Sequence, residues 1–187
     1  MKSQEINKSV LLICGALFCS SVNALDLARN EFGYYNTELD GIDGNSSLVE
    51  LSNATNSTVV IRQNSPQGWK GNKAIVRQSG NNNVAVAHQN GVNNLAYLEQ
   101  NGDDNIAAIY QNGWNNKGMI IQNGNDNFAA LVQKGNNSRE YINQQGDGNK
   151  AVVVERPGVS YSGYNINQSG NEQILIVNGM NKNISVH

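Results

Sequence analysis

A glutamine recurs every eleven residues through the middle of this chain, seven times in succession. A glycine stands two residues after each glutamine, and an asparagine stands five residues after it, with Ser138 as the one exception. The positions are Gln78, Gln89, Gln100, Gln111, Gln122, Gln133 and Gln144; Gly80, Gly91, Gly102, Gly113, Gly124, Gly135 and Gly146; and Asn83, Asn94, Asn105, Asn116, Asn127 and Asn149, with Asn72 in the preceding unit. A spacing kept this strictly predicts one short structural unit copied along an axis.

Within each unit, residues alternate with a period of two. Between Asn83 and Gln89, for example, Ala85 and Ala87 share a face with the two terminal amides, as in a β-strand. Asn-Gly pairs follow the glutamines and favour tight turns, because both residues tolerate positive φ. A helix is excluded, since a glycine in every eleven residues would cost it about 1 kcal/mol each time.

We therefore predict an all-β fold, a β-solenoid of 22-residue strand-turn-strand-turn coils that form two facing parallel sheets, as in amyloid. Strands that start at 83, 105, 127 and 149 belong to one sheet, and those that start at 72, 94, 116 and 138 belong to the other. Identical amides then stand above one another and can hydrogen-bond along the axis as ladders. Such ladders meet the cost of burying a primary amide, about 1–3 kcal/mol when it lacks a partner.

The repeat is less regular towards both ends of the chain. Gln63 and Gln168 close outlying copies, so we divide the solenoid into regular coils over 72–155 and irregular C-terminal coils over 156–187. Two acids are predicted to face inward. Glu140 should align with Gly118 and Tyr164, and Glu155 should follow Gln133 in its column and accept a hydrogen bond from that amide.

The first 24 residues have the pattern of a secretory signal peptide. Basic residues precede an apolar stretch, and Val22-Asn23-Ala24 is a small-residue cleavage site, so we predict cleavage after Ala24. Residues 25–45 then form an acidic leader, expected to be flexible, which is either a disordered tail or a sorting tag for an export pore. The solenoid is expected to span 46–187.

Other chemistry finds little support in the sequence. Cleavage after Ala24 removes both cysteines, and no basic patch favours nucleic acid. Asp103, Asp104 and Asp147 lie in predicted turns, where aspartate is common, which leaves a calcium site as a minor alternative. We expect no enzyme activity, no cofactor, no metal site and no small-molecule substrate.

The repeat Gln-x-Gly-x-x-Asn-x-Ala-x-x-x-Gln, seen from Gln78 to Gln89 and in four later copies, resembles that of the curlins. Curlins are the subunits of curli, the amyloid fibres of bacterial biofilm matrix. The leader from Asp26 to Leu39 and the charged C-terminal copies look like the minor type of subunit, which nucleates the fibre at the cell surface. The resemblance implies secretion to a cell-surface fimbrium, the major curlin subunit and self as partners, and an outer-membrane curli secretion pore with its accessory factors.

Two alternatives remain open. The first is that the chain is the major fibre subunit. The second is that it is a soluble β-solenoid that acts as an adhesin or binds ice. Ice-binding solenoids usually present a flat face of one residue type, whereas the predicted outward positions here are mixed, namely Val84, Val86, His88, Tyr97, Tyr110 and Lys117.

Overall fold

The computed structural model of the chain describes residues 10–12, 44–156, 158, 163–177 and 182–186. These residues form strands and turns throughout. The strands are β1 (Val10–Leu12), β2 (Ser46–Thr55), β3 (Thr58–Asn64), β4 (Lys73–Asn81), β5 (Val84–Val92), β6 (Leu95–Asn101), β7 (Ile106–Trp114), β8 (Lys117–Asn123), β9 (Phe128–Gln133), β10 (Arg139–Gln145), β11 (Lys150–Val154), β12 (Gly163–Ser169), β13 (Gln173–Val177) and β14 (Lys182–Val186). No helix of membrane-spanning length and apolarity occurs in the described part of the chain.

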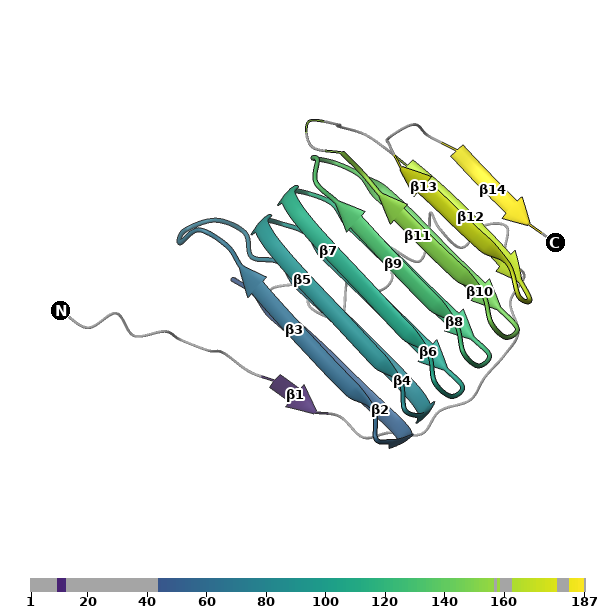
Figure 1. The fold of residues 1–187 in the computed structure, drawn as a ribbon. Helices are drawn as coiled ribbons and strands as arrows, with labels where there is room; N and C mark the ends of the chain where they lie inside the picture. The colour runs from purple at the N-terminus through teal and green to yellow at the C-terminus, as the bar shows by residue number, and fades with distance from the viewer. Residues whose placement is uncertain (1–9, 13–43, 157, 159–162, 178–181, 187) are drawn as a thin grey trace.

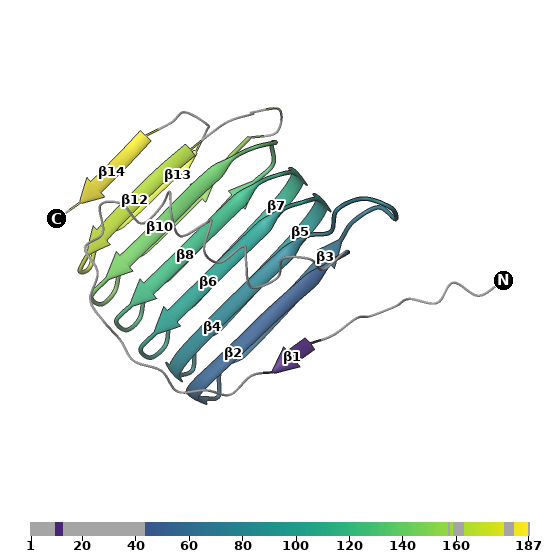
Figure 2. The same ribbon diagram turned by 180° about the vertical axis from the view of Figure 1, so that it is seen from behind.

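Successive strands alternate between two parallel sheets, as Figures 1 and 2 show from opposite sides. The eight-stranded sheet has the order β1-β2-β4-β6-β8-β10-β12-β14, and the six-stranded sheet has the order β13-β11-β9-β7-β5-β3. In both sheets the register of the regular coils advances by one 22-residue coil, so that Gln89 pairs with Gln111 and Gln100 with Gln122. The predicted β-solenoid of two facing parallel sheets is confirmed.

The register also shows where the coils become irregular. Gln144 pairs with Gln168, a separation of 24 residues, and Lys150 pairs with Gln173. The extra residues lie in the connection between β11 and β12, so the strands of the irregular coils keep their side-chain register despite the insertion.

The core between the sheets is built from the inward apolar positions of the repeat. Alanine and β-branched or leucine side chains alternate there, for example Ala107 and Ile109 in β7 and Ala96 and Leu98 in β6, and all are buried. Sheets pack about 10 Å apart, which small and medium side chains fill. The amides at the two ends of each strand close this core, since Asn105 and Gln111 are buried as completely as the residues between them.

The turns use positive φ at a different residue from the one expected. The asparagine before each glycine was expected to share this conformation, but the residue two places after the glycine adopts it. Gly91 has φ 122° and Asn93 has φ 56°, and the same pair recurs at Gly102 and Asp104. Asn and Asp tolerate this left-handed region better than other residues with a Cβ, which explains why they fill the position.

The repeat of glutamines does not predict β2. Its inward positions follow the frame of β4, with Asn45 before the strand and Leu51 paired with Gln78. Leucine therefore stands in the glutamine position, and the described solenoid includes β2 ahead of β3, whose Gln63 is the first glutamine of the columns. β1, within the predicted signal peptide, pairs with β2, whereas residues 25–43 of the predicted leader lie outside the described residues.

The outward faces of the two sheets differ. Val84, His88 and Tyr110 of the six-stranded sheet are half-buried, as expected of an outer face. Tyr97 of the eight-stranded sheet, also predicted to be an outward residue, is fully buried. It belongs to a second apolar cluster on that outer face: Leu48, Ile75, Leu95, Tyr97, Met119, Ile121 and Tyr141.

Candidate functional site: the amide columns

The glutamines form two columns through the interior. The first glutamine column, on the eight-stranded sheet, consists of Gln78, Gln100, Gln122, Gln144 and Gln168. Each Nε2 donates to the Oε1 of the next glutamine, over 2.7, 2.9, 2.9 and 2.8 Å in that order. Every donation points towards the C-terminal end of the solenoid.

The same amides also join the two sheets. The second hydrogen of Gln100 Nε2 goes to Val84 O at 3.1 Å, and that of Gln122 goes to Ile106 O at 3.1 Å, both on the six-stranded sheet. A glutamine at the end of a strand therefore binds the next coil and the start of a strand in the facing sheet. Since a net hydrogen bond contributes about 1 kcal/mol, each repeat adds about 2 kcal/mol through one side chain.

The second glutamine column, on the six-stranded sheet, consists of Gln63, Gln89, Gln111 and Gln133. The first three donate to the next glutamine at 2.8, 2.8 and 2.7 Å. The Nε2 of Gln133 then donates to Glu140 Oε2 of the facing sheet and to Lys117 O at 3.0 Å. Glu155, expected as the acceptor for Gln133, accepts instead from the Ser138 hydroxyl at 2.5 Å.

Glu140 lies where the alignment predicted, beside Gly118 and Tyr164. Both acids are buried, each with 1% of its surface exposed. Gly118 leaves space for this arrangement, because a Cβ there would lie 2.9 Å from Leu131 Cδ2 and 3.1 Å from Gln133 Oε1. The carboxylates thus end the second glutamine column in the C-terminal part of the solenoid.

The asparagines also form columns, but they bond mainly to backbone. Asn83 Oδ1 accepts from Asn105 N at 3.1 Å, and Asn83 Nδ2 donates to Gly102 O at 2.7 Å. Asn94, Asn105, Asn116 and Asn127 repeat the bond to a turn glycine one coil onward. Side-chain ladders of the expected kind occur between Asn72 and Asn94 and between Asn127 and Asn149.

Five of the turn glycines are stacked too closely for any other residue. A Cβ on Gly91 would lie 1.9 Å from Gly113 O, and one on Gly113 would lie 2.1 Å from Gly135 O. Gly80, Gly102 and Gly124 are equally crowded by the glycine of the next coil, the last by Gly146. Close backbone contact at these five turns therefore requires glycine, beyond its positive φ, whereas a Cβ on Gly146 would lie 3.4 Å from Gly170.

The first glutamine column stops at both ends. Leu51 takes the position before Gln78, and Val186 takes the position after Gln168. As a result, Gln78 Oε1 is buried and has no hydrogen-bond partner among the described residues. The sequence contained the signal for this end, since Leu51 follows Asn45 by the six residues that separate Asn and Gln in the repeat.

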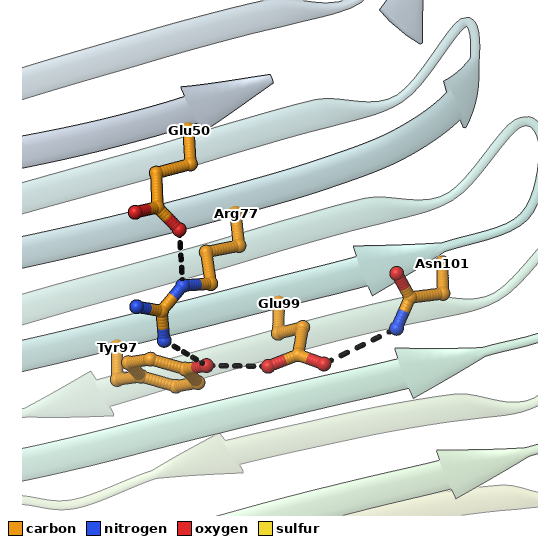
Figure 3. A network of polar contacts seen from close by, with 5 residues as sticks. All are labelled: Glu50, Arg77, Tyr97, Glu99 and Asn101. Atoms are coloured by element: carbon orange, nitrogen blue, oxygen red, sulfur yellow. Dashed lines mark hydrogen bonds and ion pairs between the residues drawn. The ribbon is translucent and has the colours of Figure 1, made fainter. Parts of the chain in front are cut away.

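A polar network crosses the outer face of the eight-stranded sheet, as Figure 3 shows. Arg77 Nε lies 2.5 Å from Glu50 Oε2, and Arg77 Nη1 donates to the Tyr97 hydroxyl at 3.1 Å. That hydroxyl donates to Glu99, which also accepts from Asn101 Nδ2 at 3.2 Å. The network fixes the buried Tyr97 ring, which the sequence pattern alone did not predict.

Three basic residues occupy the first outward row of the same sheet, at the starts of their strands. Lys73 and Lys117 align with Leu95 between them, and Arg139 follows Lys117. Burial, followed by the charges of Arg139 and Lys73, lowers the pKa of Lys117 from its ordinary value. The row therefore favours a negatively charged neighbour.

The described residues include no group of three His, Cys, Asp or Glu side chains placed to hold a metal ion. The turn aspartates bond to backbone instead, with Asp103 Oδ1 accepting from Asn81 N at 2.7 Å and Asp147 Oδ1 from Asn125 N at 2.7 Å. His88 makes an edge contact with the Tyr110 ring, 5.0 Å between centroids. These residues support the stacking of coils.

Comparison with known families agrees with this geometry. Residues 71–102, 85–113, 102–135 and 113–146 match the family model described as the curlin associated repeat. The matched residues include β4 to β10, through which the glutamine columns run. Neither a curated protein nor a solved structure matched the chain.

Proposed function

From repeats that match those of the curlins, we infer a curli-type amyloid subunit, and we propose that it acts as the nucleator of the fibre. In this proposal the chain is exported through an outer-membrane pore, stays attached at the cell surface and templates polymerisation of the major curlin subunit. The curlin repeat and the solenoid are structural, not enzymatic. The curlin family implies an extracellular fibre, which supports this location.

The observation that carries the proposal is a sheet edge that no other described strand covers and that keeps its repeat residues. β3 ends the six-stranded sheet and pairs on one side with β5. Among the described edge strands, β3 retains the glutamine of the repeat, Gln63. Unpaired backbone groups at a sheet edge template the addition of another strand, and a matching amide supports the register.

A templating edge should speed the nucleation of fibres. A free chain must close a coil before any interstrand pairing compensates for the lost entropy, so spontaneous nucleation is slow. A prefolded edge removes this cost for the incoming strand. We assign templating to the regular coils up to Gln133, and surface attachment to the part of the chain after Gln133. There Glu140 and Glu155 are buried, and Val186 takes the position that follows Gln168.

The experiment measures thioflavin fluorescence of purified major curlin subunit with a small fraction of the mature chain, residues 25–187. Thr58 N donates to Asn83 O on the β5 side, so the alternate residue Val59 directs its N–H to the open edge. Val59→Pro should therefore keep the fold, remove an edge donor and shorten the lag much less than the wild-type chain does. Val59→Ala is the matched control and should seed normally.

A truncation tests the division of roles. A chain that ends after Gln133 should still seed major-subunit fibres but should no longer be retained on cells. The proposal is wrong if the truncated chain seeds no better than buffer. If the mature chain polymerises rapidly alone and does not shorten the lag of the major subunit, it is instead the major fibre subunit. If it never produces thioflavin fluorescence, it is a soluble adhesin or ice-binding solenoid.

A further inference from the structure

The outer face of the eight-stranded sheet carries an apolar column whose side chains are all buried. It consists of Leu48, Ile75, Tyr97, Met119 and Tyr141, aligned from β2 to β10. Ile75, Tyr97 and Met119 have 0% of their surface exposed, and Tyr141 has 4%. We call it the outer apolar column.

The six-stranded sheet provides an internal comparison. The equivalent outward positions there are Val86, Ala108, Ala130 and Val152, which are smaller side chains but only half-buried. Neighbouring strands alone therefore leave such a column in partial contact with solvent. All fourteen described strands belong to one of the two sheets, so none of them lies over the outer apolar column, which Figure 2 views from its own side.

We propose that residues 25–43, the part of the predicted leader that lies outside the described residues, dock on this face. The leader is joined to the eight-stranded sheet near its β1 edge, because residues 44 and 45 lead directly into β2. Nineteen extended residues reach about 60 Å, whereas β2 and β10 are separated by four strand spacings, about 19 Å. The leader is thus long enough to cross the whole column.

The chemistry of the leader complements the face. Leu27, Phe32, Tyr34 and Leu39 provide apolar and aromatic side chains. The same segment carries five acids and one base, and the first outward row presents Lys73, Lys117 and Arg139 beside the column. Opposite charges set the position of the segment, and apolar burial holds it.

The docked leader has a role in the assembled molecule that is independent of templating. It shields an apolar strip that would otherwise promote side-by-side association of solenoids. A second copy of the chain is the competing occupant of this face, and the rate of Met119 oxidation with and without the leader distinguishes the two occupants.

The experiment follows oxidation of Met119 by hydrogen peroxide in assembled material. Trypsin releases Met119 in a peptide of residues 118–134, and tandem mass spectrometry measures the sulfoxide. The mature chain is compared with a chain of residues 44–187. Because methionine oxidation follows exposure, Met119 should oxidise about tenfold faster without the leader. A synthetic peptide of residues 25–43 should restore protection, and a scrambled peptide should not.

Ala130→Met, made in both chains, is the matched control on the other outer face. Its oxidation rate should be the same with and without the leader, which excludes a general loosening of the solenoid. Neutralising the leader with Glu31→Gln, Glu38→Gln and Asp40→Asn together should speed Met119 oxidation about threefold, since the charge contacts are lost. Equal Met119 oxidation rates in the two chains would overturn the proposal and assign the face to a second copy. If neutralising the leader left the Met119 rate unchanged, charge would have no part in docking.

Discussion

The two glutamine columns of this solenoid start from the same repeat and end differently. The first glutamine column keeps an unbroken series of amides from Gln78 to Gln168, across the change of register between β10 and β12. The second changes at Gln133, whose amide donates to the carboxylate of Glu140. One column therefore holds identical groups along the axis, whereas the other brings buried charge into the C-terminal coils.

The difference separates two ways of satisfying a buried polar group. In the first glutamine column each amide is satisfied by a copy of itself, so a coil can be added without new chemistry. In the second, each acid depends on a particular partner: Glu140 accepts from Gln133 of the facing sheet, and Glu155 accepts from Ser138, which replaces the asparagine of the repeat. Unlike an amide, a buried carboxylate carries a desolvation cost of several kcal/mol that its hydrogen bonds must offset.

The strongest test breaks the first glutamine column at its centre. Gln122→Leu leaves Gln100 Nε2 without its side-chain acceptor, and it leaves Gln144 Oε1 and Ile106 O without their side-chain donor. Loss of a partner at three groups, at about 1–3 kcal/mol each, should lower the free energy of unfolding by about 4 kcal/mol. Guanidinium denaturation of the mature chain measures the loss.

Its control is a glutamine next to the same column. Gln145 is exposed and directly follows Gln144, so Gln145→Leu should change the stability by no more than about 0.5 kcal/mol. Equal losses in the two variants would show that the column does not stabilise the fold.

A second test makes the two columns more alike. Glu140→Gln keeps an acceptor for Gln133 and removes a buried charge, so it should stabilise the assembled chain by about 1–2 kcal/mol at pH 7. Denaturant midpoints of the two chains at pH 7 measure the gain, and a variant that assembles no better than the parent at pH 7 would contradict the cost assigned to Glu140.

The smallest effect is expected from lengthening the first glutamine column. Leu51→Gln places an amide beside Gln78, whose buried Oε1 lacks a partner among the described residues. Because the donations run towards the C-terminal end, the new Nε2 should meet that oxygen and add about 1 kcal/mol. Leu51→Met, similar in length but without the amide, should add nothing, and a similar gain in both variants would assign it to packing.

The sequence predicted the parallel sheets and the register well, because both follow from local rules. Alternation fixes which residues face inward, and the repeat of Gln89 at Gln111 fixes the pairing. It did not reveal β2, since Leu51 breaks the amide pattern while keeping the apolar one. The burial of Tyr97 was missed because the pattern within a strand reports only which face a side chain takes and contains nothing about what covers that face.

The partners of the buried acids were also only partly predictable. Alignment placed Glu140 correctly between Gly118 and Tyr164. Its bond to Gln133, seven residues earlier in the chain, crosses from one sheet to the other and depends on the space that Gly118 leaves. Register describes neighbours within a sheet, so contacts between sheets require the three-dimensional packing.

The shared direction of the glutamine donations gives the molecule two unlike tips. At the β3 tip the outermost amide, Gln63, has already committed its hydrogens to Gln89 and to backbone carbonyls, so it can offer only oxygen to a newcomer. If two β3 tips met, the amide oxygen of one Gln63 would face the amide oxygen of the other. A tip that supplies N–H donors would instead extend the column of hydrogen bonds. Stacking of molecules along these columns is therefore vectorial, with every subunit facing the same way and each end elongating at its own rate.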